Sequence, residues 1–120
     1  MSEKLTDFRQ LNVWQKAHQL VMDVYEVTKK FPKEEKTELV SLMRQSAMLI
    51  PIKIAEGFMR RSPREKEISY KLTLQSTEEL KYYLILAHDL DYLKENENML
   101  LAVDEIGRML TGLVRSAKGK

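Results

Sequence analysis

Basic side chains gather in the middle of the sequence, in a pattern that suits the binding of phosphate groups. Between residues 53 and 71, six basic residues are interspersed with three acidic ones. Phe58 and Tyr70 lie in the same segment. Arginine guanidinium groups beside aromatic rings are better suited to binding single-stranded or folded RNA than to reading bases in the groove of a duplex. The alternative is an ordinary solvated charged surface. The candidate phosphate-binding residues are Lys53, Arg60, Arg61, Arg64, Lys66 and Lys71.

A second set of polar residues interrupts two otherwise apolar helical patterns. Carboxylates are rarely buried unless they are paired, so we expect Glu56 or Glu79 to have a cationic or amide partner, with Arg44 as the first choice. One interpretation is a structural network that fixes how two helices align. The other is a ligand-binding or catalytic site in which the two glutamates act as an acid/base pair. The candidate members of this polar network are Arg44, Gln45, Glu56, Ser76 and Glu79.

The familiar enzymatic and metal-binding patterns are absent from the sequence. It has no cysteine, and therefore no disulfide, thiolate nucleophile or cysteine-bound metal. It contains no phosphate-binding glycine loop and no GxSxG, HExxH or EF-hand pattern. Neither His18 nor His88 has a glutamate three residues before it, unlike the Glu-x-x-His pairs of di-iron bundles. We therefore predict no metal site, no cofactor and no enzymatic activity.

Amphipathic helices must position these side chains. Apolar residues recur at spacings of three and four from Leu11 onward, until Phe31-Pro32 ends the first helix. A second helix is predicted from residue 39 to residue 61. Pro51 lies inside it, and because proline removes a backbone hydrogen bond, we expect the helix to kink there or to break and restart.

The third helix has a strong start signal. Ser62 is the predicted N-cap, Pro63 the first helical residue and Glu65 the third residue of a capping box. The helical pattern then continues to about Asp91-Tyr92. Its predicted inward positions include Ile68, Leu72, Gln75, Ser76, Glu79 and Leu80.

The fourth helix is expected to begin at a cap provided by Asn96 or Asn98. It contains Gly107 and Gly112, and each costs about 1 kcal/mol relative to alanine inside a helix. We therefore expect these two glycines, like Gly57 in the second helix, to permit a close approach between helices. Four helices with short connections predict an all-α, antiparallel up-and-down four-helix bundle over residues 11–117, after a short arm at residues 1–10.

The composition fits one soluble domain with an uneven distribution of charge. The chain has 120 residues and a net charge of +2, which is too small by itself to indicate a nucleic-acid-binding protein. Residues 78–105 carry eight acidic side chains against two lysines, whereas residues 108–120 are basic. This polarity fits either a polyanion site or self-association through complementary patches. Because no apolar leader and no run long enough to cross a membrane is present, we expect a cytoplasmic protein.

Three segments of the sequence resemble a known family. They read FRQLNVWQKAHQL, MRQSAMLIPIKIAEGFMRRSPREKE and LQSTEELKYYLILAHDLDYL. They are similar to the four-helix-bundle family named for proteins encoded in intervening sequences of bacterial 23S rRNA genes, and the similarity extends from about Phe8 to Leu113. The family hallmark is R-x-x-x-x-I/V-P-x-N-I-A-E-G-x-x-R-x-S, followed by G-S-x-x-E-L. The matching residues here are Pro51, Ile54, Ala55, Glu56, Gly57, Arg60, Ser62, Ser76, Glu79 and Leu80.

The resemblance implies a bundle that assembles into a homopentamer and has no catalytic activity. Relatives accompany reverse transcriptases in diversity-generating retroelements, so the implied partners are RNA or another nucleic acid, and a reverse transcriptase or another protein. Two residues depart from the family pattern. Lys53 replaces the usual Asn and adds a charge beside Pro51, and Gln75 replaces the usual Gly and should add bulk at a tight helix contact.

Two functional hypotheses follow from the sequence. In the first, the protein is an oligomeric, non-enzymatic adaptor whose arginine-rich corner contacts RNA. In the second, it is a protein interaction module with no nucleic-acid role, in which the acidic region of one subunit meets the basic corner of the next.

Overall fold

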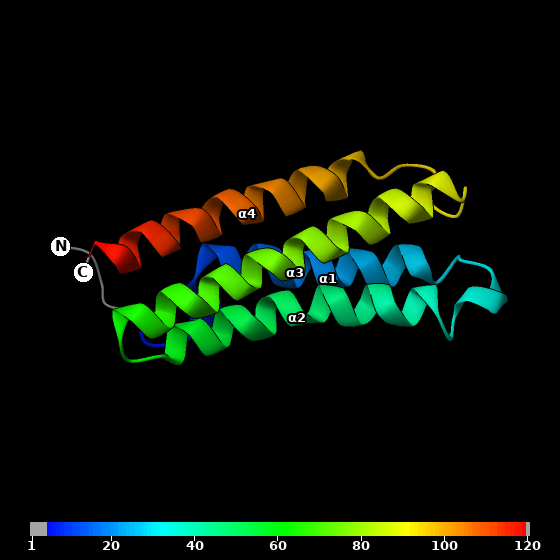
Figure 1. Cartoon of the computed structure of the whole chain (residues 1–120). Helices are drawn as coiled ribbons and strands as arrows, with labels where there is room; N and C mark the ends of the chain where they lie inside the picture. Colours follow the sequence, from blue (N-terminus) through cyan, green and yellow to red (C-terminus); the bar gives the residue numbers. More distant parts are fainter. Residues whose placement is uncertain (1–4, 120) are drawn as a thin grey trace.

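The computed structural model describes residues 5–119, which fold into four antiparallel helices (Figure 1). Neighbouring helices along the chain run in opposite directions, so the start of α1, the α2–α3 connection and the end of α4 lie at the same end of the bundle. No strand occurs within the described residues, and the predicted all-α, up-and-down four-helix bundle is confirmed. The elements are η1 (Phe8–Gln10), α1 (Asn12–Thr28), η2 (Lys33–Glu35), α2 (Leu39–Met59), α3 (Pro63–Asp89) and α4 (Glu97–Lys118).

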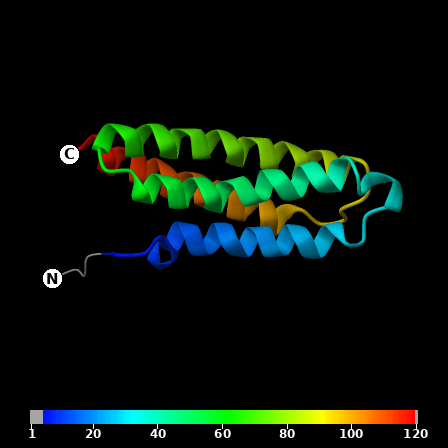
Figure 2. The same ribbon diagram turned by 90° about the horizontal axis from the view of Figure 1, so that it is seen from below.

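Each helix packs against two neighbours. Helices α1 and α3 both contact α2 and α4, and the bundle measures 49 × 24 × 22 Å (Figure 2). The inward face of every helix supplies fully buried apolar side chains, and this burial is the main source of stability in such a fold. Central core residues are Leu20, Val24, Met43, Ile50, Leu80, Leu84, Ile106 and Leu110.

Helix α2 continues without interruption through Pro51. Of the two outcomes expected there, the break and restart does not occur. Proline withdraws a single backbone donor, and Pro51 is buried like its neighbours Ala47 and Ile50 in the same helix. Burial of this part of α2 in the core therefore outweighs the loss of one hydrogen bond.

The start of α4 differs in its capping from the sequence-based prediction. Asn96 occupies the N-cap position, but its side chain donates to the Leu84 carbonyl oxygen at 3.4 Å and makes no capping bond. The carboxylate of Glu95 instead accepts from the backbone N–H groups of Glu97 and Asn98. A carboxylate at this position also suits the positive end of the helix dipole.

The two glycines of α4 do not lie at a close helix contact, so this prediction is wrong. A Cβ atom built on Gly107 would have only Leu74 Cδ2 as a neighbour, at 4.0 Å, and one built on Gly112 would have no atom within 4 Å. The close contact occurs at Gly57, as described below. The packing of this chain thus gives no reason for glycine at either position of α4.

The predicted N-terminal arm contains a folded turn. Residues 8–10 form η1, which leads directly into α1, while residues 1–4 of the arm lie outside the described part of the chain. Among the described helices, none is both long enough and apolar enough to cross a membrane.

Candidate nucleic-acid interface at the basic end

The predicted N-cap and first-turn proline form the corner between α2 and α3, but of the predicted capping box only the bond to the Ser62 side chain is present. Ser62 Oγ accepts from the backbone N–H of Glu65 at 3.0 Å, and Pro63 is the first residue of α3. On the other side of the corner, the extended Arg60 donates its backbone N–H to the Gly57 carbonyl oxygen at 3.2 Å. The chain therefore reverses direction within three residues, which places the side chains of Arg60 and Arg61 at the tip of the bundle.

A close approach of α2 and α3 supports this corner. A Cβ atom built on Gly57 would lie 2.6 Å from Tyr70 Cε1 and 3.2 Å from Ser69 Oγ. The Tyr70 side chain is buried, and this burial raises the pKa of its hydroxyl. Gly57 thus has the role expected of it, since only glycine leaves room for the buried tyrosine ring.

Lys66, one of the predicted phosphate-binding residues, contacts the end of α2. Its Nζ donates to the carbonyl oxygens of Phe58 at 2.7 Å and Gly57 at 3.2 Å, and it lies 5.5 Å from the centroid of the Phe58 ring. A cation bound to the last carbonyl groups of a helix satisfies them and opposes the helix dipole. Lys66 therefore helps to hold the corner together.

The end of α4 extends the basic surface, which the sequence pattern did not place there. Glu67 pairs with Lys71 at 2.8 Å and lies 3.9 Å from Lys118 Nζ of α4. The hydrogen bond from Lys71, helped by the charges of Lys118 and Arg64, holds the pKa of the Glu67 carboxyl below its ordinary value. We call this region the basic end and define it by Arg60, Arg61, Arg64, Lys66, Lys71 and Lys118.

Among the basic residues of this region, the arginines at the tip contribute least to holding the fold together. Arg60, Arg61 and Arg64 are exposed, and within residues 5–119 no carboxylate lies within 4 Å of their guanidinium groups. Lys53 is half-buried and lines a small pocket of about 190 Å³ together with Glu56. Of the six predicted residues, the three arginines are therefore best placed to contact an external anion.

The predicted polar network does not form. Arg44 Nε donates to Thr28 Oγ1 at 2.9 Å, and its guanidinium carbon lies 4.3 Å from the centroid of the Tyr25 ring. The predicted pairing of Arg44 with Glu56 or Glu79 is wrong, because Arg44 binds the C-terminal end of α1. The positive charge of Arg44 is favourable at the end of α1 because it opposes the helix dipole, as the charge of Lys66 does at the end of α2.

The remaining members of the predicted network are also separated. Ser76 is buried, whereas Gln45, Glu56 and Glu79 are exposed. Glu56 shares its small pocket with Glu65, and Glu79 lies fourteen residues further along α3, a distance of about 21 Å along the helix. The two glutamates thus share no cleft, and they cannot act as an acid/base pair within one subunit.

The outer surfaces of α2 and α3 expose several large apolar side chains. Ile52 is 50% exposed and Leu72 46% exposed, and Leu72 lines the small pocket beside Lys53 and Glu56. Ile68, Leu72, Gln75 and Glu79 were predicted to point inward, and this prediction is wrong. We define the apolar face by Leu42, Leu49, Ile52, Met59, Ile68, Leu72 and Tyr82.

A family model described as 23S rRNA-intervening sequence protein matches residues 9–112, which is most of the chain. The chain belongs to this family. No match was found among curated proteins. The predicted effect of Gln75 is wrong: it adds no bulk to a helix contact, because its side chain is exposed on α3. Lys53 adds a charge at the edge of the apolar face.

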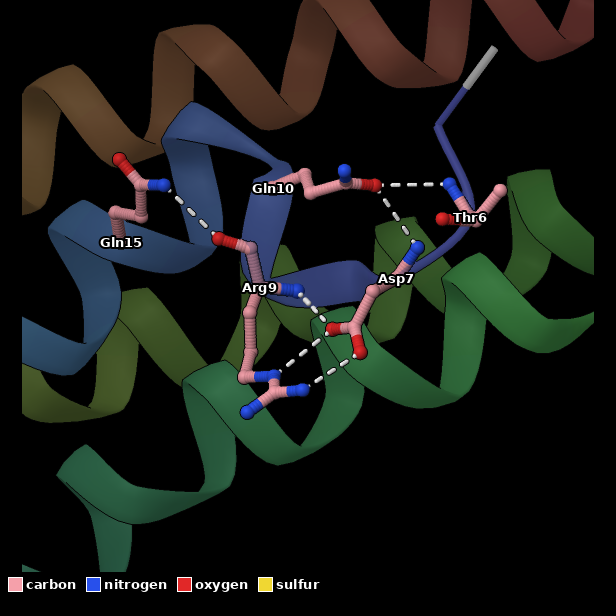
Figure 3. A network of polar contacts seen from close by, with 5 residues as sticks. All are labelled: Thr6, Asp7, Arg9, Gln10 and Gln15. Carbon is pink, nitrogen blue, oxygen red and sulfur yellow. Dashed lines mark hydrogen bonds and ion pairs between the residues drawn. The ribbon is translucent and has the colours of Figure 1, made fainter.

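The N-terminal turn is held by a local polar network (Figure 3). The Asp7 carboxylate accepts from the backbone N–H of Arg9 at 2.8 Å, and from its Nε and terminal nitrogen at 3.0 and 2.9 Å. Gln10 Oε1 accepts from the backbone N–H groups of Thr6 and Asp7. Gln15 ties the turn to α1 by donating to the Arg9 carbonyl oxygen at 2.9 Å.

This turn borders an apolar groove of about 540 Å³ between α1 and α2. The rings of Phe8 and Trp14 lie 5.3 Å apart, and His18 stacks on Trp14 with an interplanar angle of 5°. His88 is distant in sequence, and its Nδ1 lies 3.7 Å from the carboxylate of Asp89. In the described part of the chain, no three His, Asp or Glu side chains come together as a metal site.

We predict that η1 opens in acid. The bonds from Arg9 lower the pKa of Asp7 to about 2, so they stabilise the turn above the ordinary carboxyl pKa of about 4 and are lost as the pH falls through the lowered value. The backbone amide resonance of Arg9 should titrate with a midpoint near pH 2. The Asp7→Asn variant should lack this titration, and a midpoint near pH 4 in the native protein would contradict the prediction.

Proposed function

We propose that this protein is a non-enzymatic, self-associating RNA-binding adaptor whose basic end contacts the phosphate groups of RNA. The observation that carries the proposal is the placement of three exposed arginines at one tip of the bundle, without carboxylate partners among the described residues. Glu67 at the centre of this surface is already paired with Lys71, while Glu56 and Glu65 line a small pocket with Arg60. The three arginines at the tip outnumber these two unpaired carboxylates, so the tip keeps an excess of positive charge.

The geometry of the corner suits an extended or looped strand. Arg60 and Arg61 precede α3, and Arg64 lies in its first turn, where backbone N–H groups point outward and the helix dipole favours an anion. Guanidinium groups bind phosphate oxygens in a bidentate fashion. Among residues 5–119, the three arginines lie on a corner and a first helical turn rather than along one face of a helix, which favours RNA loops and single strands over duplex DNA.

Self-association is the second part of the proposal. The apolar face exposes seven large side chains on α2 and α3, and contiguous apolar patches on a protein surface commonly mark interaction sites. We propose that copies of this chain associate through the apolar face, in the homopentamer that the family resemblance implies. In the alternative function, this face and the basic end serve only protein partners, such as another subunit or a reverse transcriptase, and no nucleic acid is bound.

Binding of a fluorescently labelled single-stranded RNA, followed by anisotropy over a range of salt concentrations, tests the proposal. The native protein should bind at low salt and lose affinity steeply as salt rises, because phosphate contacts release counterions. Arg60→Gln combined with Arg61→Gln should weaken binding and reduce the slope of log K against log salt by about 1.4, since each single-strand phosphate contact contributes about 0.7.

The matched control removes the same charge from the opposite end of the bundle. Lys29→Gln combined with Lys30→Gln changes two adjacent exposed lysines at the end of α1, and it should leave RNA binding unchanged. If the native protein bound no RNA at low salt, or if both double variants weakened binding equally, the adaptor function would be rejected and the protein-only alternative favoured.

A further inference from the structure

A groove between α3 and α4 is unexplained by the packing of this chain. It has a volume of about 590 Å³, and its α4 side carries Arg108, Thr111 and Arg115. Gly107 and Gly112 also line the groove, and a Cβ atom added to either would meet open space or one distant side chain. Glycine inside a helix is unfavourable, and no helix contact requires it here. The absence of two side chains instead keeps the groove open and its backbone accessible.

The charges of the groove favour a polyanion. Arg108 and Arg115 lie two helical turns apart on the same side of α4, about 10 Å along its axis. Both are exposed, and neither has a carboxylate within 4 Å among residues 5–119. Of the two acids in the lining, Asp104 is paired with Lys81 at 3.2 Å, which leaves Glu78 as the one carboxylate without an ion pair there.

The groove is continuous with the basic end. Arg115 precedes Lys118 by three residues on α4, so the two side chains lie on the same side of the helix. On α3, Lys71 precedes Leu74 of the groove by the same interval. The ion pairs of Glu67 with Lys71 and Lys118 then connect this end of the groove to the tip of the bundle.

We propose that the α3–α4 groove holds the sugar–phosphate backbone of a single RNA strand that continues from the basic end. This inference rests on the proposed function and specifies where the strand runs. Arg108 and Arg115 contact successive parts of the phosphodiester backbone, and the two glycines let that backbone approach the helix closely. The side chain of Thr111 donates to the Gly107 carbonyl oxygen at 2.9 Å, and its oxygen can still accept from a ribose 2′-hydroxyl.

Filling the groove is the sharpest test, because the substitution should not harm the fold. Gly112→Gln replaces glycine by a better helix former with open space around it, so the unfolding temperature should rise while affinity for labelled single-stranded RNA falls several-fold. Ser116→Gln is the matched control on α4, since Ser116 is exposed and does not line the groove. It should bind RNA like the native protein.

Removing the charges gives an independent readout. Arg108→Gln combined with Arg115→Gln should reduce the salt slope of RNA binding by about 1.4. If Gly112→Gln and the arginine pair both bound RNA like the native protein while Arg60→Gln/Arg61→Gln weakened binding, the groove inference would fail and the basic end would stand. Absence of RNA binding by the native protein would reject both. A change in sedimentation coefficient with unchanged RNA affinity would assign the groove to a protein partner and overturn the inference.

Discussion

Replacing Gly57 with alanine is expected to lower the free energy of unfolding by about 1 to 3 kcal/mol, the usual cost of inserting an extra group into a packed core. The added Cβ would lie 2.6 Å from Tyr70 Cε1, well inside van der Waals contact. The ring cannot move outward easily, because Tyr70 is buried between α2 and α3. Movement of α2 would instead disturb the bonds from Lys66 to the Gly57 and Phe58 carbonyl oxygens. Urea denaturation at a fixed protein concentration measures the change.

The same substitution in α4 provides a control of opposite sign. Gly112→Ala should raise the free energy of unfolding by about 1 kcal/mol, because helix propensity improves and no atom lies close enough to clash. The difference between the two variants isolates the contact with Tyr70 from the general effect of alanine in a helix. Equal stabilisation by both substitutions would show that the α2–α3 contact relaxes without cost.

Local signals in the sequence were sufficient for the helices and the corner. The three- and four-residue spacing, the Phe31-Pro32 stop and the Ser62-Pro63 start depend on neighbouring residues, and the structure has α1, α2 and α3 close to the predicted positions. The effect of Pro51 was overestimated because a local rule gives the cost of the lost hydrogen bond but not the packing that opposes it. The cap of α4 was misassigned for a similar reason, because the Asn96 side chain donates to the carbonyl oxygen of Leu84, twelve residues earlier.

Helical spacing alone could not identify which side of a helix faces the core. Helix α3 has an inward stripe that includes Leu80 and Leu84, and beside it an outward stripe that includes Ile68 and Leu72. Both have the same period, so the exposed polar residues of the outward stripe looked like buried ones. The error extends to Glu79, which was expected to point inward and to be a candidate for a cationic or amide partner although its side chain is exposed.

Contacts between distant segments explain the other differences at the candidate site. Lys66 was expected to bind phosphate, but folding brings it against the Phe58 carbonyl oxygen, and Lys118 joins the basic end through Glu67. The sequence likewise cannot distinguish the roles of Gly57 and Gly112, because it does not show whether a glycine lies at a close helix contact or beside an open groove. These assignments required the arrangement of all four helices.

Placing a charge on the apolar face is expected to dissociate the proposed oligomer while leaving each subunit folded. Ile52→Glu combined with Leu72→Glu puts two carboxylates at positions that are about half exposed in the subunit, so the free energy of unfolding of the isolated subunit should change little. In an assembled interface the same charges would lie in a dry contact without partners, at a cost on the order of 3 kcal/mol or more. Analytical ultracentrifugation should therefore show a shift from oligomer to monomer.

A control on α4 and a salt series distinguish this apolar contact from the electrostatic one in which acidic and basic regions meet. Leu101→Glu changes a residue that is 62% exposed but lies on α4, off the apolar face, and it should leave the oligomer intact. An oligomer held by apolar contacts should persist at high salt, since screening weakens exposed ion pairs and not the burial of apolar surface. If high salt or the Arg60→Gln/Arg61→Gln variant dissociated the oligomer and the glutamates on the apolar face did not, the electrostatic contact would be the correct one. The basic end would then be covered in the assembly, and it could not bind RNA at the same time.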